Sequence, residues 1–379
     1  MRKALILSEA SVYKSPNGAV FARGGGEVCI HNIGKSLALM GFDSVVLAIS
    51  EFDEQSAEEK IDGVLYRRVK VKSKTSFSML KYLIEAVSIS RNFDAVFVNQ
   101  FTPHLVLPFL KAKNKVAIIH DVYSLEGLKF WISQFGFFRG GIGYFVEKLQ
   151  LIFDKKYASK IMIVSEFSAG KVVKALGESI RDKIVVNPYP LEIDSVKSNA
   201  TRENFMLFMG RFVKYKHPEH VLFALSRIKA VYGDFKAVFI VPRVEKNCMR
   251  IFKKWQRELG LSDDDVILKF GCDSSEVAGL LGRAKLFTHP SVVEGQGIAI
   301  LEALQVGCSV VAYDLPVYKG MLVNGENSML TPADDYEKFA DACLRVILKN
   351  VFSREEHRGI VLNEELSEEK FMERLSTIV

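Results

Sequence analysis

One segment near the C-terminal end limits the fold of this chain more than any other. Residues 284–313, AKLFTHPSVVEGQGIAILEALQVGCSVVAY, begin with an apolar run that Pro290 ends, as expected of a buried strand and a turn. Residues 298–306 have helical composition and stop at Gly307, and residues 309–313 form a second apolar run. Strand, glycine loop, helix and strand predict part of an open α/β sheet. Its loop lies at the carboxyl end of the first strand, where such sheets bind ligands.

Two carboxylates in this segment indicate a binding site. Glu294 lies in the loop and Glu302 lies inside the apolar helix, with seven residues between them. A carboxylate on an apolar helix against a sheet is costly unless it is hydrogen-bonded, and a ribose diol would satisfy it. The alternative is a helix turned so that Glu302 meets solvent. Gly295 and Gly297 open the helix, whose free N–H groups suit a phosphate.

The sequence PSVVEGQGIAILEAL resembles the E-x7-E motif of the retaining nucleotide-sugar glycosyltransferases of the GT-B type, specifically glycosyltransferase family four. The resemblance implies that Glu302 holds the nucleotide ribose and that Glu294 faces the donor sugar as a catalytic residue. It also implies that Gly295, Gly297 and Ile298 contact the donor.

A second element carries two cations after an apolar run at residues 205–209. Arg211 and Lys216 flank a strand-to-helix loop, and fixed cations there stabilise the charge that accumulates on a diphosphate leaving group. Two solvated surface charges are the alternative. The loop resembles the GR-x4-KG element of the same family, which implies donor-binding and catalytic roles for both residues. His217 stands where the family usually has a glycine, and Gln296 stands where it often has an aromatic residue. The sugar specificity therefore stays open.

The N-terminal half offers two further candidates. Gly24, Gly25 and Gly26 precede a helical pattern and let a phosphate approach the backbone, although flexible turns are the commoner use of such a triplet. No G-x-G-x-x-G fingerprint is present, which argues against a dinucleotide cofactor. His120 and Asp121 end an apolar strand, and a structural loop histidine is the alternative to an active-site group. The resemblance implies that Gly25 and Gly26 contact the donor and that His120 is an active-site polar residue on the acceptor side.

Residues 128–157 are aromatic and interleaved with Lys and Arg. Residues 144–153 are expected to form a core helix, whereas FWISQFGFFRGG before them is harder to bury and suits an anchor at an anionic membrane. Residues 1–190 carry 26 Lys and Arg against 18 Asp and Glu, and this excess also fits an acidic partner. Because no nucleic-acid-binding motif accompanies the charge, we expect no nucleic acid partner.

The length of 379 residues predicts two domains and an extension. We place an N-terminal domain at 1–190, a polar linker at about 190–202, a second domain at 203–352 and a helical tail at 353–379. The resemblance implies that the first domain binds the acceptor, that the second is the nucleotide-sugar-binding domain, and that the tail packs toward the first domain. Five scattered cysteines have no metal-ligand spacing and favour a reducing compartment. No signal peptide or spanning segment is apparent, so we expect a cytoplasmic location, with peripheral contact at the inner face of the membrane.

Together these features predict an α/β chain. The resemblance covers essentially the whole chain and implies two Rossmann-like β/α/β domains facing across a cleft, the GT-B fold. It implies metal-independent transfer of a hexose from a nucleoside diphosphate sugar, with retention, to a hydroxyl of a glycan, lipid-linked saccharide or small molecule. We expect no cofactor and no metal, and we take Asp263, Asp264 and Asp265 as a solvated loop. A GT-B-type sugar-nucleotide epimerase and a non-catalytic sugar-nucleotide-binding relative are the alternatives.

Overall fold

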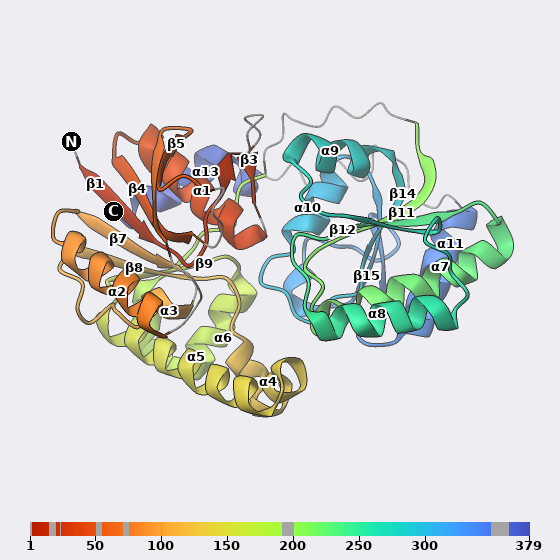
Figure 1. Ribbon diagram of the computed structural model, residues 1–379, viewed down its shortest axis with the longest axis horizontal. Coiled ribbons are helices and arrows are strands. Elements are labelled where there is room, and N and C mark those ends of the chain that lie inside the picture. Colours follow the sequence, from red (N-terminus) through yellow and green to blue (C-terminus); the bar gives the residue numbers. More distant parts are fainter. Residues whose placement is uncertain are drawn as a thin grey trace. The chain divides into compact units, whose positions relative to one another are not determined.

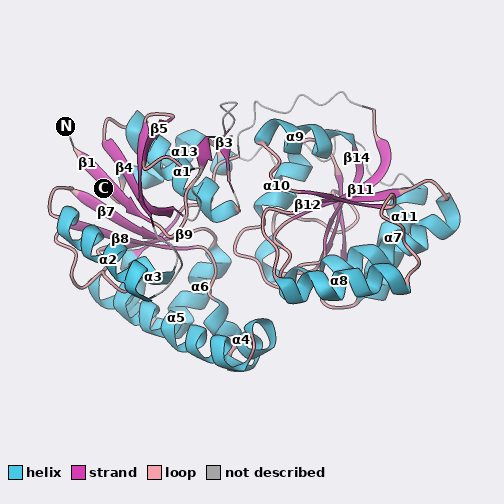
Figure 2. Cartoon of the chain, viewed as in Figure 1, coloured by secondary structure: helices cyan, strands magenta, loops and turns pink. Residues whose placement is uncertain are grey.

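The computed structural model describes residues 2–14, 20–22, 24–50, 55–70, 76–99, 101–191, 201–349 and 364–379. The chain forms two compact units: Met1–Pro190 with Glu365–Val379, and Leu191–Glu364. Each unit is built on a sheet of largely parallel strands with helices on both faces (Figures 1 and 2), which confirms the α/β class. Of the expected linker and tail, residues 192–200 and 353–363 lie outside the described residues.

The sheet of the N-terminal unit has the order β10-β9-β8-β7-β1-β4-β6-β5. Its strands are β1 (Lys3–Leu7), β4 (Asp43–Ser50), β5 (Glu58–Ile61), β6 (Val64–Lys70), β7 (Ala95–Asn99), β8 (Asn114–Ile119), β9 (Lys160–Ile163) and β10 (Ile184–Val186). Only β5 runs antiparallel to its neighbour β6 among these described strands. From β1 the chain extends the sheet first through β4 and later through β7. The strand order therefore reverses between β1 and β7, a position where open α/β sheets bind ligands.

Helices cover both faces of this sheet (Figure 1). They are α1 (Gly25–Leu39), α2 (Ser76–Ser90), α3 (Phe101–His104), α4 (Leu128–Phe135), α5 (Phe137–Tyr157), α6 (Glu166–Leu176) and α13 (Glu368–Ser376), with the small ribbon β2 (Tyr13–Lys14) and β3 (Val20–Phe21) beside them. Helix α13 packs against α1 and buries Phe371 and Leu375 completely. Asn187 donates from Nδ2 to the carbonyl of Phe371 at 3.2 Å, so the C-terminal helix belongs to the N-terminal unit.

The aromatic segment differs from the expectation that only residues 144–153 are helical. It forms two helices, α4 and α5, and Gly140 and Gly143 lie inside α5. A Cβ on Gly140 would lie 2.5 Å from the carbonyl oxygen of Trp131, and a Cβ on Gly143 would enter the Trp131 ring. These glycines are therefore needed for the close crossing of the two helices, a packing contact that the chain sequence alone does not reveal.

The C-terminal unit has a wholly parallel sheet of order β13-β12-β11-β14-β15-β16. Its strands are β11 (Glu203–Met209), β12 (Lys236–Ile240), β13 (Val266–Lys269), β14 (Ala284–His289), β15 (Ser309–Tyr313) and β16 (Ser328–Thr331). The order reverses between β11 and β14. The loops that follow these two strands carry the two sequence motifs, so the fold brings both motifs to one binding position.

The helices of this unit are α7 (Pro218–Tyr232), α8 (Lys246–Glu258), α9 (Ser274–Arg283), α10 (Ile298–Gln305) and α11 (Tyr336–Lys349). Helices α7, α8 and α11 cover one face of the sheet and α9 and α10 the other (Figure 2). Phe212, Phe239 and Phe252 are fully buried between the first face and its helices. Of the loop expected to be solvated, Asp263 and Asp264 are exposed, whereas Asp265 is half-buried, pairs with Lys229 and accepts a hydrogen bond from the N–H of Ser262.

Arg202 joins the ends of two helices in the C-terminal unit. Its Nη1 donates to the carbonyls of Leu281, Gly282 and Ala284 at 2.8–2.9 Å. Its Nη2 donates to the carbonyls of Val306 and Gly307 at 3.1 and 2.6 Å. Carbonyls at helix C-termini lack intrahelical partners and carry partial negative charge, so a guanidinium satisfies them well. One side chain thereby fixes the C-terminal ends of α9 and α10.

Candidate active site

The loops after β11 and β14 are joined by their backbones. Val292 donates its N–H to the carbonyl of Tyr215 at 2.9 Å. The fully buried Ser291 donates from Oγ to the carbonyl of Val293 at 2.9 Å, closing its own turn. On the other side, Phe212 pairs with the 243–245 segment through two backbone hydrogen bonds of 2.8 and 2.9 Å. Both loops are therefore held in place by the backbone, which fixes the positions of the side chains they carry.

A buried charged cluster lies where these loops meet. Oε1 of Glu294 accepts hydrogen bonds from Lys216 Nζ and from His289 Nε2, the second at 2.6 Å. Burial alone would raise the pKa of Glu294, but the Lys216 ammonium and the His289 ring outweigh it and hold the pKa well below its usual range. Burial also lowers the pKa of His289 against the opposing effect of Glu294. The cluster thus contains a carboxylate, an ammonium and a neutral imidazole.

The same cluster has unused hydrogen-bonding capacity. Oε2 of Glu294 accepts no hydrogen bond from the residues that the structure describes. His289 donates from Nε2, and its buried Nδ1 has no partner among those residues. Unsatisfied buried polar groups are rare in folded proteins and point to a ligand, a water or strain. Oε2 of Glu294 is therefore available for a hydroxyl of a bound ligand.

The glycine loop opens helix α10 as the sequence predicts. Gly297 is the N-cap with φ 81°, and Ile298 is the first helical residue. Gly295 is buried in the same turn, and Glu302 lies half-buried one turn into the helix. The amides at the start of a helix lack intrahelical acceptors and suit an anion. The predicted residues of the C-terminal unit that would bind the sugar-nucleotide donor thus lie on two adjoining loops and one helix.

Replacing Gly297 with alanine is expected to disrupt the turn for two reasons. The φ of 81° disfavours a side chain, and a Cβ would lie 2.8 Å from the Tyr318 ring. We expect Gly297→Ala to lower the free energy of unfolding by at least about 2 kcal/mol, since a left-handed residue alone costs about 1–3 kcal/mol. Gly320→Ala is the matched control, because Gly320 has φ 84° and a Cβ there would meet nothing within 4 Å. Urea unfolding of both variants separates the effect of the clash from that of the left-handed backbone. Equal losses in the free energy of unfolding would show that the clash has no effect.

Arg211 lies at the start of the first loop, directly after β11. Its Nη2 donates to the Tyr215 hydroxyl at 2.7 Å, which orients the guanidinium within the loop. Burial raises the pKa of Glu245, while the charge of Arg211 opposes this rise. Arg211 and Lys216 therefore stand in one structured loop, which argues against two freely solvated surface charges.

The N-terminal unit has its own polar cluster at its strand reversal. His120, after β8, interacts through Nε2 with Oδ1 of Asn99 at 2.5 Å and through Nδ1 with the Tyr189 hydroxyl at 2.6 Å. The amide of Asn99 in turn donates to Ser8 Oγ at 3.4 Å. Since Asn99 Oδ1 accepts, Nε2 carries the proton and Nδ1 accepts from Tyr189. With both ring nitrogens engaged, His120 is oriented by the protein.

Gly25 and Gly26 begin α1 in this N-terminal unit. Further along the same helix, the thiol of Cys29 hydrogen-bonds Tyr189, the residue that also contacts His120. The first turns of α1 are thereby connected to the polar cluster around His120. The structure thus divides the predicted site residues between the two units: Gly25, Gly26 and His120 in the first, and the others in the second.

Several polar residues at the strand ends belong to no motif in the sequence. His289 ends β14, Asn99 ends β7, and Glu9 follows β1 and accepts from both the N–H and the hydroxyl of Thr102. All lie at the end of an apolar strand or within two residues of it. That signal is present in the sequence, but only the strand order shows which strand ends adjoin.

The loop after His120 depends on a buried carboxyl. Glu147, on α5, accepts hydrogen bonds from the N–H groups of Tyr123 and Ser124. Burial raises the pKa of Glu147 to about 7, although these hydrogen bonds oppose the rise. Helix α5 thus holds the short 3-10 turn Tyr123–Glu126 beside the strand end.

Comparison with known proteins identifies related sequences. Residues 192–363 match the family described as glycosyl transferases group 1. Phosphatidyl-myo-inositol mannosyltransferase of Mycobacterium leprae is 27% identical over 188 residues, which cover 48% of this chain and 48% of that protein. The O-antigen chain mannosyltransferase RfbU of Salmonella typhimurium is 22% identical over 252 residues, or 64% of this chain and 66% of that protein. The matched region thus spans about half to two thirds of these relatives.

The fold is also found among solved structures. HepE from Anabaena, in complex with UDP and glucose, superimposes with a TM-score of 0.78 at 15% identity, covering 100% of this chain and 99% of that chain. At this identity the likeness establishes the fold. None of the helices in the described part of this chain is long and apolar enough to cross a bilayer.

Proposed function

We propose that this chain, which has the GT-B fold of two Rossmann-like domains and whose residues 192–363 match the glycosyl transferases group 1 family, is a glycosyltransferase. It transfers a hexose from a nucleoside diphosphate sugar to a hydroxyl acceptor. The observation that carries the proposal is the buried Glu294–Lys216–His289 cluster at the strand reversal beside the N-terminus of α10.

The donor is assigned to the C-terminal unit by the chemistry of its groups. Arg211 and Lys216 supply fixed positive charge for the diphosphate, and the first amides of α10 add hydrogen-bond donors. Glu302 accepts from the ribose hydroxyls, and the unused Oε2 of Glu294 accepts from a hydroxyl of the sugar. Because the cations are provided by side chains, the reaction needs no metal at this position.

Retention follows from a front-face reaction in this proposal. The bond between the anomeric carbon and the diphosphate oxygen breaks while the acceptor oxygen attacks from the same face. The leaving phosphate then takes the acceptor proton, and the two cations stabilise the charge that develops on it. His120, oriented by Asn99 and Tyr189, positions the acceptor on the N-terminal unit.

Calorimetric titration with UDP, GDP and ADP and their hexose conjugates, without metal, tests the proposal. The titration compares the glucose and mannose conjugates of each nucleotide, because HepE was solved with UDP and glucose and the matched relatives are mannosyltransferases. Binding of one base is expected, and Glu302→Ala is expected to weaken it at least tenfold. Gln305→Ala, one turn later on α10, is the control. Absence of binding by every nucleotide would reject the proposal, and donor turnover to a new sugar nucleotide without acceptor would favour an epimerase.

An apolar surface on α5 supports a membrane-associated acceptor. The surface comprises Phe137, Phe138, Ile142, Phe145 and Ile152, whose exposed fractions are 55–81%. Their spacing of three to four residues places most of them along one side of the helix. Arg139 and Lys148 on the same helix are exposed, and basic residues are typical of helices that lie in the interface of an anionic membrane. We propose that the chain works at the cytoplasmic face of such a membrane on a lipid-linked hydroxyl acceptor.

The triple variant Phe137→Ser/Phe138→Ser/Ile142→Ser tests the membrane contact. Each buried apolar side chain stabilises by about 1.5–3 kcal/mol, so we expect binding to vesicles to fall at least a hundredfold. The measurement is co-sedimentation with vesicles of phosphatidylglycerol and phosphatidylcholine. Leu80→Ser/Ile84→Ser removes the exposed apolar pair on α2 and is expected to leave binding unchanged. An equal effect of both variants, or no vesicle binding by the wild type, would contradict the assignment.

A further inference from the structure

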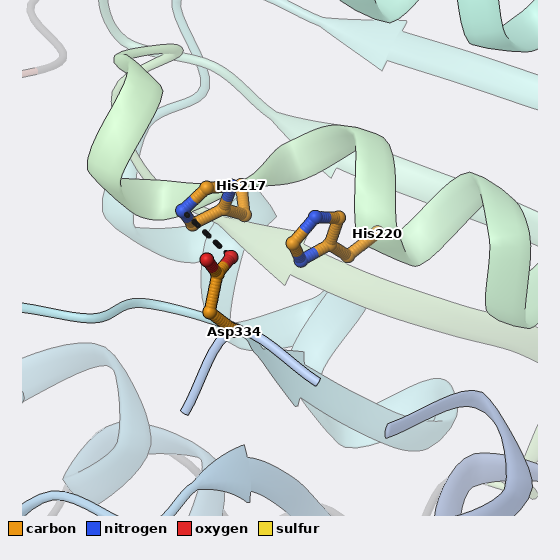
Figure 3. Close-up of side chains that lie close together, drawn as sticks. All are labelled: His217, His220 and Asp334. Atoms are coloured by element: carbon orange, nitrogen blue, oxygen red, sulfur yellow. Dashed lines mark ion pairs between the residues drawn. The ribbon is translucent and has the colours of Figure 1, made fainter. Parts of the chain in front are cut away.

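Two histidines and an aspartate lie close together at the start of α7. They take no part in the hydrogen bonds of the Glu294–Lys216–His289 cluster described above. His217 is the N-cap of α7, His220 lies in its first turn, and Asp334 follows β16 (Figure 3). One nitrogen of each ring and one oxygen of the carboxylate all lie within 4.8 Å of one another. Among the described residues, no other group of His, Cys, Asp and Glu side chains meets this criterion for a metal site.

The outer nitrogens of both rings are held by protein groups. Nδ1 of His217 donates to Oε1 of Glu219 at 3.0 Å, and Nδ1 of His220 lies 2.7 Å from the Tyr313 hydroxyl. Histidine ligands of metals commonly bind through one nitrogen while the other is hydrogen-bonded to a carboxylate or another polar group. The hydrogen bond to Glu219 places the lone pair of His217 on Nε2.

That lone pair faces another acceptor. Nε2 of His217 lies 3.6 Å from Oδ1 of Asp334, and the two imidazole rings stack with centroids 4.4 Å apart. Ligand atoms of a tetrahedral zinc site lie roughly 3.3 Å apart when bonds are about 2.0–2.1 Å long. Small side-chain rotations thus bring the three atoms to one ion. Asp334 has this freedom, because 71% of its side chain is exposed.

Backbone geometry favours the same arrangement. His217 and Asp334 have φ of 43° and 65°, two of the three described non-glycine residues with positive φ. Such conformations cost about 1–3 kcal/mol each and gather at ligand sites.

We propose that His217, His220 and Asp334 bind a divalent cation of the zinc class. The nitrogen donors and single carboxylate match zinc better than calcium or magnesium, which prefer oxygen ligands. Three protein ligands leave a fourth position for water. The ion would tie the turn before α11 to the loop that carries Lys216, the residue directly before His217, without entering the transfer step.

Cobalt(II) provides the first test on the full-length protein after chelator treatment. A four-coordinate site of this type is expected to give visible d–d bands with one equivalent of Co²⁺, which one equivalent of Zn²⁺ abolishes. A thiolate charge-transfer band would assign the ion to a cysteine and overturn the proposal, as would the absence of binding.

Asp334→Asn removes one ligand without requiring a new backbone conformation, since asparagine tolerates positive φ. We expect the affinity for Zn²⁺, measured by competition with a chromophoric chelator, to fall roughly a hundredfold or more, since loss of an outer partner alone costs about 10- to 100-fold. Asp62→Asn is the matched control: Asp62 also has positive φ, at 47°, and contacts a single histidine, His31, at 3.0 Å. Wild-type affinity in Asp334→Asn, or an equal loss in Asp62→Asn, would overturn the proposal.

Discussion

Replacing Lys216 with methionine is expected to lower turnover by about a hundred- to a thousandfold. The proposed reaction places developing negative charge on the diphosphate, and removal of one fixed donor to such a charge typically costs this much. Methionine retains the length of the side chain but not its ammonium. The measurement is steady-state turnover with the donor that the titrations identify. Lys214→Met, in the same turn but exposed, is expected to keep wild-type turnover.

The same substitution leaves Glu294 buried without its cation. Breaking a buried ion pair from one side typically destabilises by about 3–5 kcal/mol, so loss of turnover alone would be ambiguous. The double variant Lys216→Met/Glu294→Gln removes both charges and is expected to regain most of the lost stability while turnover stays low. Recovery of turnover together with stability would show that Lys216 acts only by maintaining the fold.

Replacing Arg202 with methionine is expected to destabilise the C-terminal unit strongly. Five carbonyls at the ends of α9 and α10 lose their shared donor. Hydrogen bonds to a charged group each contribute about 1.5–3 kcal/mol, but they are not additive when one side chain makes them all. We therefore expect a loss of about 3–5 kcal/mol in the free energy of unfolding of the C-terminal unit.

The two tryptophans allow this loss to be assigned to one unit. Trp131 belongs to the N-terminal unit and Trp255 to the C-terminal unit, so a Trp131→Phe background leaves Trp255 as the fluorescent reporter. Urea unfolding is then followed at Trp255. Arg283→Met, which removes the exposed pair with Glu203 and one exposed hydrogen bond to the carbonyl of Gly279, is the control and is expected to cost less than about 1 kcal/mol. Equal losses for the two variants would mean that the carbonyl contacts contribute little.

The sequence alone determined the features that depend on residues close together in the chain. The alternation of apolar strands and helical patterns predicted the α/β class. The E-x7-E segment predicted a glycine turn that opens a helix, observed as α10, with Glu302 inside it. These features are local, because backbone preferences and side-chain periodicity act over a few residues.

Only the tertiary structure decided which distant side chains meet. It joined Glu294 to Lys216 and His289, oriented His120 through Asn99 and Tyr189, and used Gly143 as a contact for Trp131. Each of these contacts depends on strand order or helix crossing, which arise from packing of the whole unit. The type of a residue and its neighbours in the chain do not identify such partners. The same histidine or glycine therefore has several equally good interpretations until its contacts in the folded unit are known.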